Sequence, residues 1–224
     1  MITRDVFVTG GTGYVGQRLV PALIRRGHRV RVLARAESAS RVPHGATVVI
    51  GDALNPESYL HTVRPGETLV HLVGTPRPSP AKAEEFRRID LPSIEAAVNV
   101  ASRAGVAHLV YVSVAHPAPV MHAYIAVRSQ GEALIAQTGL TATFVRPWYV
   151  LGPGHWWPLI LLPMYAAAAC VPAFRDGAHR LGLVTIRQMV AALVSAVENP
   201  PPLRTQRVVD VPHIRRGLAA VMVA

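Results

Sequence analysis

The stretch "VTGGTGYVG" (residues 8–16) is the strongest structural signal in this 224-residue chain. Its glycines fit two overlapping patterns: Gly11, Gly13 and Gly16 match G-x-G-x-x-G, and Gly10, Gly13 and Gly16 match G-x-x-G-x-x-G. A valine-rich, strand-like run precedes the stretch and a helical pattern follows it. At such a turn, backbone amides and the helix dipole face an anion, and glycines let a diphosphate approach closely. The stretch therefore predicts a binding loop for a phosphate ester.

Strand-length apolar runs alternate with helical patterns along most of the chain. Most runs are rich in valine and continuous, as expected for strands buried on both faces of a parallel sheet. Strands are predicted at 5–9, 29–34, 46–50, 68–73, 108–113, 141–146 and 207–211, and helices at 14–26, 55–62, 81–104 and 123–138. Asp90, followed by Pro92, is expected to end one helical piece and cap the next. The alternation predicts an α/β fold of the Rossmann type, a doubly wound parallel sheet that binds ligands beyond the carboxyl ends of its strands.

The pattern changes near residue 150 and predicts two parts of one folding unit. Residues 1–150 form the nucleotide-binding Rossmann domain, and residues 151–224 form a small, mainly helical segment that shapes a substrate pocket. Residues 156–174 carry no charge, over a length close to the roughly 20 residues of a membrane span. Three prolines interrupt this run, at Pro158, Pro163 and Pro172. Short buried helices over an apolar pocket are therefore favoured, and peripheral membrane contact stays open as the alternative.

The residues expected to line that pocket are large and apolar or aromatic. They are Trp156, Trp157, Met164 and Tyr165. Such a lining suits a small-molecule substrate that is itself apolar.

The net charge of +10 and the pI near 10.9 resemble those of nucleic-acid-binding proteins. The basic residues nevertheless occur singly or in pairs, such as Arg25 with Arg26, and aromatic residues make up only 6% of the chain. Neither a basic run nor a stacking platform is evident, so nucleic acid is not expected as a partner. Of the 23 basic residues only Lys82 is a lysine, which reflects a chain-wide preference for arginine.

Cysteine and histidine usage bounds the setting and the metal chemistry. Cys170 is the only cysteine, so no internal disulfide forms, and a first strand beginning by Asp5 leaves no room for a signal peptide. A reducing, cytoplasmic setting is expected. The ten histidines show no metal-ligand spacing beside carboxylates, so no metal site is expected. His71, inside a predicted strand, is expected to be a packed core residue.

The tip of the second strand bears on which nucleotide the loop binds. Enzymes that use NAD place an acidic residue about 20 residues after the loop to bind the ribose hydroxyls, whereas an arginine there accommodates a 2′-phosphate. The strand "RVRVLAR" (29–35) ends in Arg35, with no acid at its tip. NADP(H) is therefore predicted over NAD(H). The alternative is a solvated arginine in an arginine-rich chain.

Four stretches together resemble the atypical short-chain dehydrogenases/reductases. They are "TGGTGYVG" (9–16), "GDALNPES" (51–58), "YVSVAHPAPVMHAYIAVRSQGEALI" (111–135) and "TATFVRPWYVLGPG" (141–154). By pattern, the chain is similar to the NmrA-like NAD(P)-binding proteins and to the nucleotide-binding accessory subunit of respiratory complex I. The resemblance implies that the loop binds the diphosphate through Gly10, Thr12, Gly13, Tyr14 and Val15. It also implies Asp52 and Ala53 beside the adenine, Val73 and Gly74 beside the ribose, and Pro147 and Trp148 near the nicotinamide.

Catalysis in this superfamily uses a serine after the fifth strand and a Tyr-x-x-x-Lys motif on the next helix. Residues at i and i+4 share one helical face, and a cation there lowers the pKa of a phenol that exchanges a proton during hydride transfer. Ser113 and Tyr124 match the pattern, but Arg128 stands where the family has lysine. One account keeps a slow reductase, because a guanidinium still supplies a positive charge. The other makes the chain a non-catalytic binder, because arginine and lysine differ in geometry.

These observations favour an NADPH-dependent oxidoreductase that transfers hydride to a small apolar carbonyl or enone. Tyr124 would donate the proton, Ser113 would position the carbonyl oxygen, and Arg128 would anchor the ribose. The rival is a non-catalytic NADP(H)-binding protein that senses redox state or stabilises a complex. An epimerase or dehydratase of nucleotide sugars is a third reading, disfavoured because the C-terminal segment is short and apolar.

Overall fold

A computed structural model gives the fold and describes residues 2–156, 159–160, 177 and 180–221. Seven strands form one parallel sheet in the order β3-β2-β1-β4-β5-β6-β9. Their bounds are β1 Asp5–Thr9, β2 Arg29–Ala34, β3 Thr47–Ile50, β4 Thr68–His71, β5 His108–Val112, β6 Ala142–Val145 and β9 Gln206–Val209. The strand order reverses between β1 and β4, which opens a crevice at the carboxyl ends of the strands. The predicted doubly wound α/β fold is confirmed.

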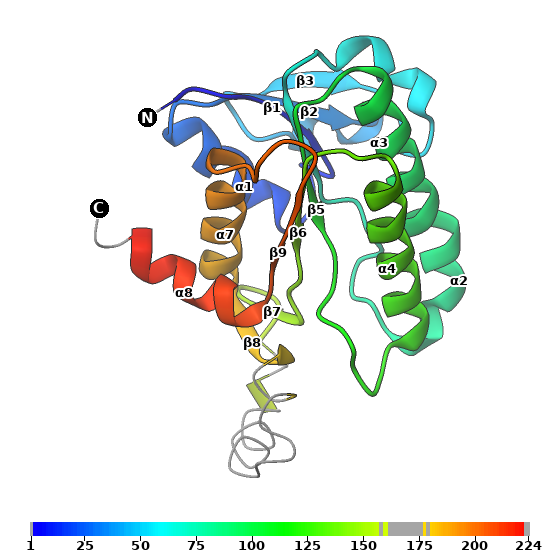
Figure 1. Cartoon of the computed structure of the whole chain (residues 1–224), viewed down its shortest axis with the longest axis vertical. Coiled ribbons are helices and arrows are strands. Elements are labelled where there is room, and N and C mark those ends of the chain that lie inside the picture. Colours follow the sequence, from blue (N-terminus) through cyan, green and yellow to red (C-terminus); the bar gives the residue numbers. More distant parts are fainter. Residues whose placement is uncertain (1, 157–158, 161–176, 178–179, 222–224) are drawn as a thin grey trace.

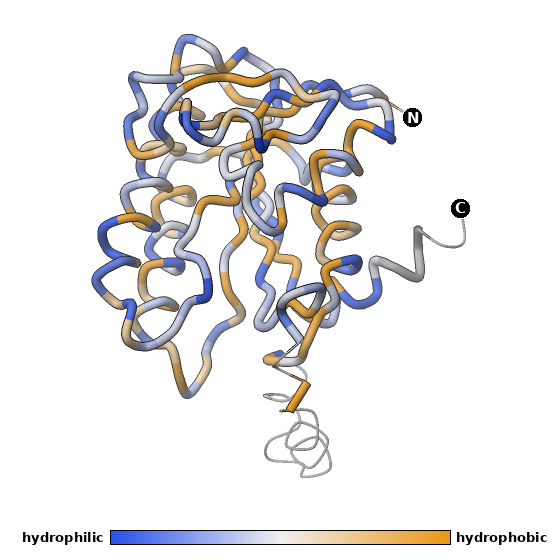
Figure 2. The backbone as a smooth tube through the Cα atoms, turned by 180° about the vertical axis from the view of Figure 1, so that it is seen from behind, coloured by the Kyte–Doolittle hydropathy of each residue, from blue (hydrophilic) through white to orange (hydrophobic). Residues whose placement is uncertain are grey.

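Two helical layers cover the sheet (Figure 1). One face carries α1 (Gly16–Arg25), α7 (Ile186–Glu198) and α8 (Val211–Val221), and the other carries α3 (Leu91–Arg103) and α4 (His122–Gln137). Successive side chains of a strand point to opposite faces. Within β1, Val6 and Val8 accordingly enter the core under α1 and α7, and Phe7 enters the core under α3. Figure 2 shows the hydrophobic stretches running through the middle of the molecule, between the two layers.

The predicted strands are all present, with ends that differ from the expected ones by at most two residues. Two helical predictions were wrong in detail. The segment 55–62 holds two 3-10 turns, and the segment 81–104 begins with irregular turns before α3. These pieces are Pro56–Ser58, Leu60–Thr62, Pro80–Lys82, α2 Ala83–Glu85 and a π-helical turn Phe86–Asp90.

The prediction that Asp90 caps a helix was wrong. Its backbone is helical (φ −67°, ψ −47°) and its side chain makes no capping hydrogen bond. The π-helical turn runs directly into α3, so no free helix start exists there for Asp90 to cap. Its carboxylate instead binds Thr75 and Arg128.

The C-terminal segment contributes to the main sheet and adds a small second one. β9 pairs with β6, whereas β7 (Tyr149–Leu151) and β8 (Leu183–Thr185) form a separate two-stranded sheet. Thr185 begins α7 with a capping box. No helix among the described residues is long and apolar enough to cross a membrane. Several predicted positions lie outside the described residues, namely Trp157, Pro158, Pro163, Met164, Tyr165, Cys170 and Pro172.

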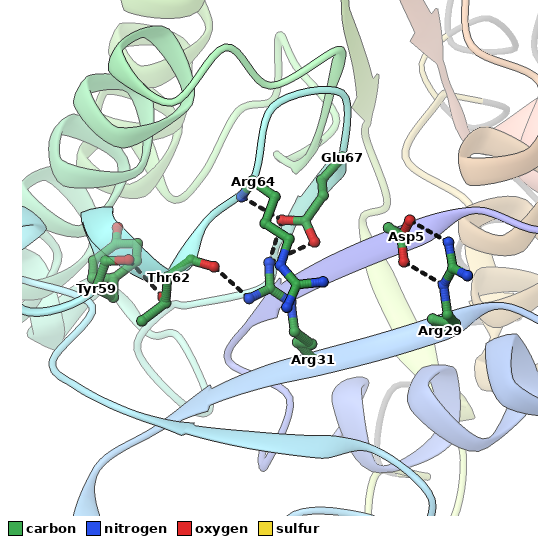
Figure 3. A network of polar contacts seen from close by, with 7 residues as sticks. All are labelled: Asp5, Arg29, Arg31, Tyr59, Thr62, Arg64 and Glu67. Atoms are coloured by element: carbon green, nitrogen blue, oxygen red, sulfur yellow. Dashed lines mark hydrogen bonds and ion pairs between the residues drawn. The ribbon is translucent and has the colours of Figure 1, made fainter.

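Ion pairs join the strands at their amino ends, opposite the crevice (Figure 3). Asp5 at the start of β1 accepts two hydrogen bonds of 2.6 Å from Arg29 at the start of β2. Arg31 of β2 pairs with Glu67, which directly precedes β4 and is almost fully buried. These contacts stabilise the amino edge of the sheet. The ligand crevice lies at the other edge, at the carboxyl ends of the strands.

Candidate functional site

A cavity of about 340 Å³ lies beyond the carboxyl ends of β1, β2, β3 and β4. It contains eight of the residues that the sequence predicted for cofactor binding: Gly10, Thr12, Gly13, Arg35, Asp52, Ala53, Val73 and Gly74. The remaining lining residues were not predicted, and most of them directly flank predicted ones: Leu33, Ala34, Ser38, Gly51, Leu54, Leu72 and Ile89. Their position at strand ends was the available signal, because every strand end on this edge faces the crevice.

The glycine loop is built by close packing. Gly10 has a left-handed backbone (φ +75°), and a Cβ there would stand 2.8 Å from the carbonyl carbon of Leu72. A Cβ on Gly11 would meet Val32 at 2.6 Å, and one on Gly16 would meet the Cα of Gly11 at 2.5 Å. Gly11 and Gly16 therefore hold the loop and α1 against β2, and neither lines the cavity. The glycines at positions 10, 11 and 16 of the two patterns are therefore explained by packing, because none of them has room for a Cβ.

The loop also presents unused hydrogen-bond donors. Among the described residues, no acceptor binds the backbone N–H groups of Thr12, Tyr14 and Val15, whereas the N–H of Gly13 binds the Gly10 carbonyl at 3.1 Å. A Cβ on Gly13 would have the Gly10 carbonyl oxygen at 3.2 Å as its only close neighbour, so this residue leaves the space above the loop open. Free amides at a helix start beside an open cavity fit a diphosphate.

Tyr14 and Val15 turn their side chains away from the cavity. The Tyr14 ring packs 4.3 Å from His155 and lies 4.2 Å from the guanidinium carbon of Arg18, and Val15 packs against the hydrophobic core. Their side chains therefore anchor the loop to the C-terminal segment and the core. Only their backbone amides are available to a ligand.

Arg35 lies at the tip of β2 with a largely exposed side chain. Its Nε lies 3.1 Å from a carboxylate oxygen of Glu37. Ser38 lines the cavity beside it and donates its hydroxyl to the Arg35 carbonyl at 3.1 Å. The acid Glu37 therefore lies two residues beyond Arg35 at the strand tip, and its carboxylate pairs with the arginine predicted to bind the 2′-phosphate. Because both side chains are 64% exposed, water screens this pair strongly.

Arg128 is buried, and its guanidinium is held by protein groups. It donates to Asp90 at 2.6 Å and to the backbone carbonyls of Val73 and Val112 at 3.1–3.4 Å. Burial alone would lower the pKa of Arg128, but the facing Tyr124, Tyr111 and Asp90 raise it above its ordinary value. This arginine therefore ties the carboxyl ends of β4 and β5 to the start of α3.

Asp90 and Gly74 complete this arrangement, and the sequence missed the role of both. The second oxygen of the Asp90 carboxylate accepts from the Thr75 amide at 2.9 Å and from the Thr75 hydroxyl at 2.6 Å. A Cβ on Gly74 would stand 2.1 Å from an Arg128 nitrogen. Gly74 is therefore required where the guanidinium passes the loop after β4.

Ser113 and Tyr124 lie at the carboxyl edge of the same sheet. The Ser113 amide donates to the Val145 carbonyl at 2.8 Å, and its hydroxyl is buried with no hydrogen-bond partner among the described residues. Tyr124 lies in the first turn of α4, where its ring packs 4.9 Å from Phe86 and 5.1 Å from the Arg128 guanidinium carbon. Neither residue lines the cavity at the glycine loop. Ser113 and Tyr124 lie farther along the carboxyl edge than this cavity, beyond the end of β5.

Pro147 and Trp148 follow β6 on this edge. The Pro147 carbonyl accepts from the Ala115 amide at 2.9 Å, which holds the loop after β6 beside the loop after β5. Trp148 packs against the core under α1 and α7 and against Tyr149, at 5.5 Å between ring centroids. Trp156, predicted for the substrate pocket, borders a second hollow on the face of α1 and α7. The chain turns back at Gly152–His155 to contact Tyr14, which carries Trp156 to that face.

A series of buried, hydrogen-bonded side chains lies beneath the site. His71 at the end of β4 is fully buried, as predicted, and its ring nitrogens contact the Thr9 hydroxyl at 2.9 Å and the Ser93 hydroxyl at 3.3 Å. Burial, helped by the charge of Arg128, lowers the pKa of His71 to about 3. The imidazole is therefore neutral near pH 7, and it links β1 to α3 behind the glycine loop. No group of three metal-ligating side chains occurs within the described ranges.

Comparison with known proteins adds the family. A model of the NAD(P)H-binding family matches residues 10–152. A ceramide reductase of Caulobacter vibrioides is 28% identical over 197 residues, covering 87% of this chain and 61% of the relative. A ketoreductase of Stigmatella aurantiaca that acts on a 4-farnesyl-dihydroquinoline-1-oxide is 30% identical over 168 residues, covering 65% of this chain and 50% of the relative. The chain thus spans between half and two thirds of these relatives.

Solved structures show the same fold. A short-chain dehydrogenase/reductase superfamily protein of Agrobacterium tumefaciens with bound NAD has a TM-score of 0.66 at 17% identity, over 97% of this chain and 83% of that one. A UDP-N-acetylglucosamine 4-epimerase of Bacillus cereus has a TM-score of 0.66 at 16% identity, over 92% and 76%. These structures show a shared fold, and the family match, which covers more than half of the chain, shows that the chain belongs to the NAD(P)H-binding family, with a nicotinamide nucleotide as cofactor.

Proposed function

We propose that the protein is an NADPH-dependent reductase of an apolar carbonyl or enone substrate. The observation that carries the proposal is the glycine loop, where the amides of Thr12, Tyr14 and Val15 have no acceptor among the described residues, beside a cavity that Thr12, Gly13 and Arg35 line. Ser113, with an unpartnered buried hydroxyl, and Tyr124 follow on the same edge of the sheet. A diphosphate on the loop directs the rest of a dinucleotide along this edge toward them.

Ser113, Tyr124 and Arg128 have separate roles in the proposed reduction. The bound nicotinamide supplies the hydride. The Ser113 hydroxyl donates a hydrogen bond to the substrate oxygen and holds it in place. The Tyr124 phenol transfers its proton to that oxygen, so that a carbonyl gains one hydride and one proton and becomes an alcohol. Arg128 keeps the ends of β4 and β5 in register beneath the reacting groups.

The apolar substrate class rests on two supports. The relatives are named for ceramide and for a farnesyl-bearing quinoline oxide, both lipophilic molecules. The sequence adds a charge-free run over 156–174. Such a composition suits a lipophilic substrate, which binds by burying apolar area.

Preference for NADP(H) rests on Arg35 and Ser38 beside the cavity. Calorimetric titration of Arg35→Asp tests it: NADPH affinity is expected to fall roughly 10- to 100-fold, the range for losing a charged hydrogen bond, with little loss for NADH. Equal losses for both nucleotides would remove the phosphate assignment.

Binding itself is tested at Gly13. In Gly13→Glu a carboxylate enters the cavity, and like charges about 4 Å apart repel by about 4 kcal/mol at an effective dielectric constant near 20. The affinity for either nucleotide should fall by roughly two orders of magnitude or more. Gln137→Glu, which adds the same charge at the exposed end of α4, is the matched control and should bind normally.

A non-catalytic nucleotide binder is the second candidate, and the Asp90–Arg128 pair favours it. The guanidinium is already bound by Asp90 and two carbonyls, which reduces what it offers to a ribose or a phenol. A carbonyl panel with NADPH separates the two candidates. For a reductase, Tyr124→Phe should lower turnover by roughly 10²–10⁴ while nucleotide affinity is retained. Equal, slow NADPH oxidation by both proteins would establish the binder.

A further inference from the structure

A second hollow, of about 970 Å³, lies on the face formed by α1 and α7 and shares no lining residue with the nucleotide cavity. We name it the basic groove. Its walls carry four arginines, three from α1 or its end and one from the first turn of α7. They are Arg18, Arg25, Arg26 and Arg187.

The positive charge of the basic groove is largely uncompensated. Glu198 is the one carboxylate among the described residues that line it, and it is already bound by Arg26 at 2.5 and 2.9 Å and by His28 at 3.2 Å. Within the described part of the chain, no carboxylate lies within 4.0 Å of Arg18, Arg25 or Arg187. Arg25 and Arg187 are exposed, so their charges face solvent.

The same groove has an apolar lining and an apolar edge. Its apolar lining includes Ala22 of α1 and Val190 and Val194 of α7. Trp156 lines the edge with 53% of its surface exposed. The Leu159 amide donates to the Trp156 carbonyl at 3.0 Å, and Leu159 and the neighbouring Ile160 are 40% and 79% exposed.

Large exposed apolar side chains thus lie beside arginines that no described carboxylate pairs with. Tryptophan prefers the boundary between lipid headgroups and acyl chains, and arginine stems lie along apolar surface while the guanidinium meets lipid phosphate. Attraction to an anionic leaflet then adds to the burial of the apolar edge. From this combination, we propose that the basic groove, together with the exposed side chains of Trp156, Leu159 and Ile160, docks on an anionic phospholipid bilayer.

Two other occupants fit the charges or the apolar residues, but not both. A second copy of the chain would bring two positively charged grooves together, which electrostatic repulsion opposes. A polynucleotide would pair with the arginines but would leave the apolar lining and Ile160 without a partner, since nucleic-acid sites favour stacking aromatics. A bilayer satisfies both sets of groups, and the chain's net charge of +10 favours approach to an anionic surface.

Docking would occur next to the nucleotide loop. Tyr14 of that loop contacts Arg18 of the basic groove and His155 of the segment that leads to Trp156. The proposal does not depend on reductase activity, because it concerns a surface that shares no residue with the nucleotide cavity.

Cosedimentation of the full chain with phosphatidylcholine vesicles, with and without 30% phosphatidylglycerol, tests the proposal. Each arginine near an anionic surface contributes about fivefold to partitioning, so Arg25→Gln/Arg187→Gln should bind anionic vesicles about 25-fold more weakly. Arg64→Gln/Arg88→Gln is the matched control, because it removes the same two charges from exposed positions that do not line the groove. Its binding should change by less than threefold. Trp156→Ser should bind more weakly than the parent even at 0.5 M NaCl, where electrostatic attraction is screened.

Equal binding to neutral and anionic vesicles would remove the role of charge, and an equal loss of binding in both double variants would remove the role of this groove. Vesicle binding by Trp156→Ser that equals the parent's, or binding to soluble polyglutamate as tight as to anionic vesicles, would indicate a general polyanion site. Each of these results would overturn the proposal. A dimer in light scattering that Arg25→Gln/Arg187→Gln dissociates would assign the face to a second copy instead. Circular dichroism of each variant establishes that it is folded.

Discussion

Replacing Asp90 with asparagine leaves the Arg128 guanidinium buried without a counter-charge. The two side chains are 0% and 5% exposed, and their closest atoms lie 2.6 Å apart. Asparagine keeps one oxygen for Thr75 but turns an NH2 donor toward Arg128, so the change removes the charge and the acceptor of the guanidinium. Breaking a buried ion pair on one side costs about 3–5 kcal/mol. For a domain of this size, each kcal/mol shifts the melting temperature by about 2–4 °C, so a drop of roughly 6–20 °C is expected.

The chain contains a control ion pair with the same closest distance and a different environment. Asp5 and Arg29 are also 2.6 Å apart, but their side chains are 37% and 72% exposed. Water and salt screen such a pair, so Asp5→Asn should leave the urea midpoint nearly unchanged. Arg128→Met added to Asp90→Asn should recover part of the loss, because it removes the unpaired charge.

Urea unfolding followed by circular dichroism measures all four proteins. Equal midpoints for Asp90→Asn and Asp5→Asn would refute the reasoning, since it rests on burial alone to distinguish the two pairs. A double variant less stable than Asp90→Asn would show that the guanidinium stabilises the strand ends through the backbone carbonyls and not through its charge balance.

Three further predictions concern the same fold. Burial lowers the pKa of His71 to about 3 and, with Arg207 and Arg4 nearby, that of His108 to about 4. The unfolded chain therefore binds protons that the folded chain does not, and between pH 6 and 5 stability should fall by up to about 1.4 kcal/mol per pH unit per histidine; a flat urea midpoint across that range would contradict this. Gly10→Ala should lower the free energy of unfolding by about 1–3 kcal/mol, because the added Cβ meets backbone atoms and the residue has a left-handed conformation. Gly13→Ala should change the free energy of unfolding by less than about 1 kcal/mol. A calorimetric measurement in which Gly13→Ala is the less stable variant would exclude the loop geometry. Glu37→Gln frees the guanidinium with which it pairs and should raise NADPH affinity up to about fivefold, and a fall in affinity would mean that Glu37 itself binds the nucleotide.

The sequence alone determined the doubly wound sheet and the place of its ligand. Valine-rich runs that alternate with helical patterns are typical of a parallel sheet covered by helices, and a glycine turn between the first strand and the first helix marks the crevice. Eight predicted cofactor residues accordingly meet in one cavity, because each follows a strand whose carboxyl end lies on the same edge. These are local signals, set by periodicity and by backbone chemistry.

Only the tertiary structure decided which partners the side chains find. Asp90 read as a helix cap, but the backbone runs helically through it and its carboxylate binds Arg128, 38 residues along the chain. Trp156 was predicted for the substrate pocket, and the structure places it on a hollow beside α1 and α7, after a turn that contacts Tyr14. Contacts of this kind join residues distant in sequence, and their pairing depends on packing across the whole sheet, which no local pattern encodes.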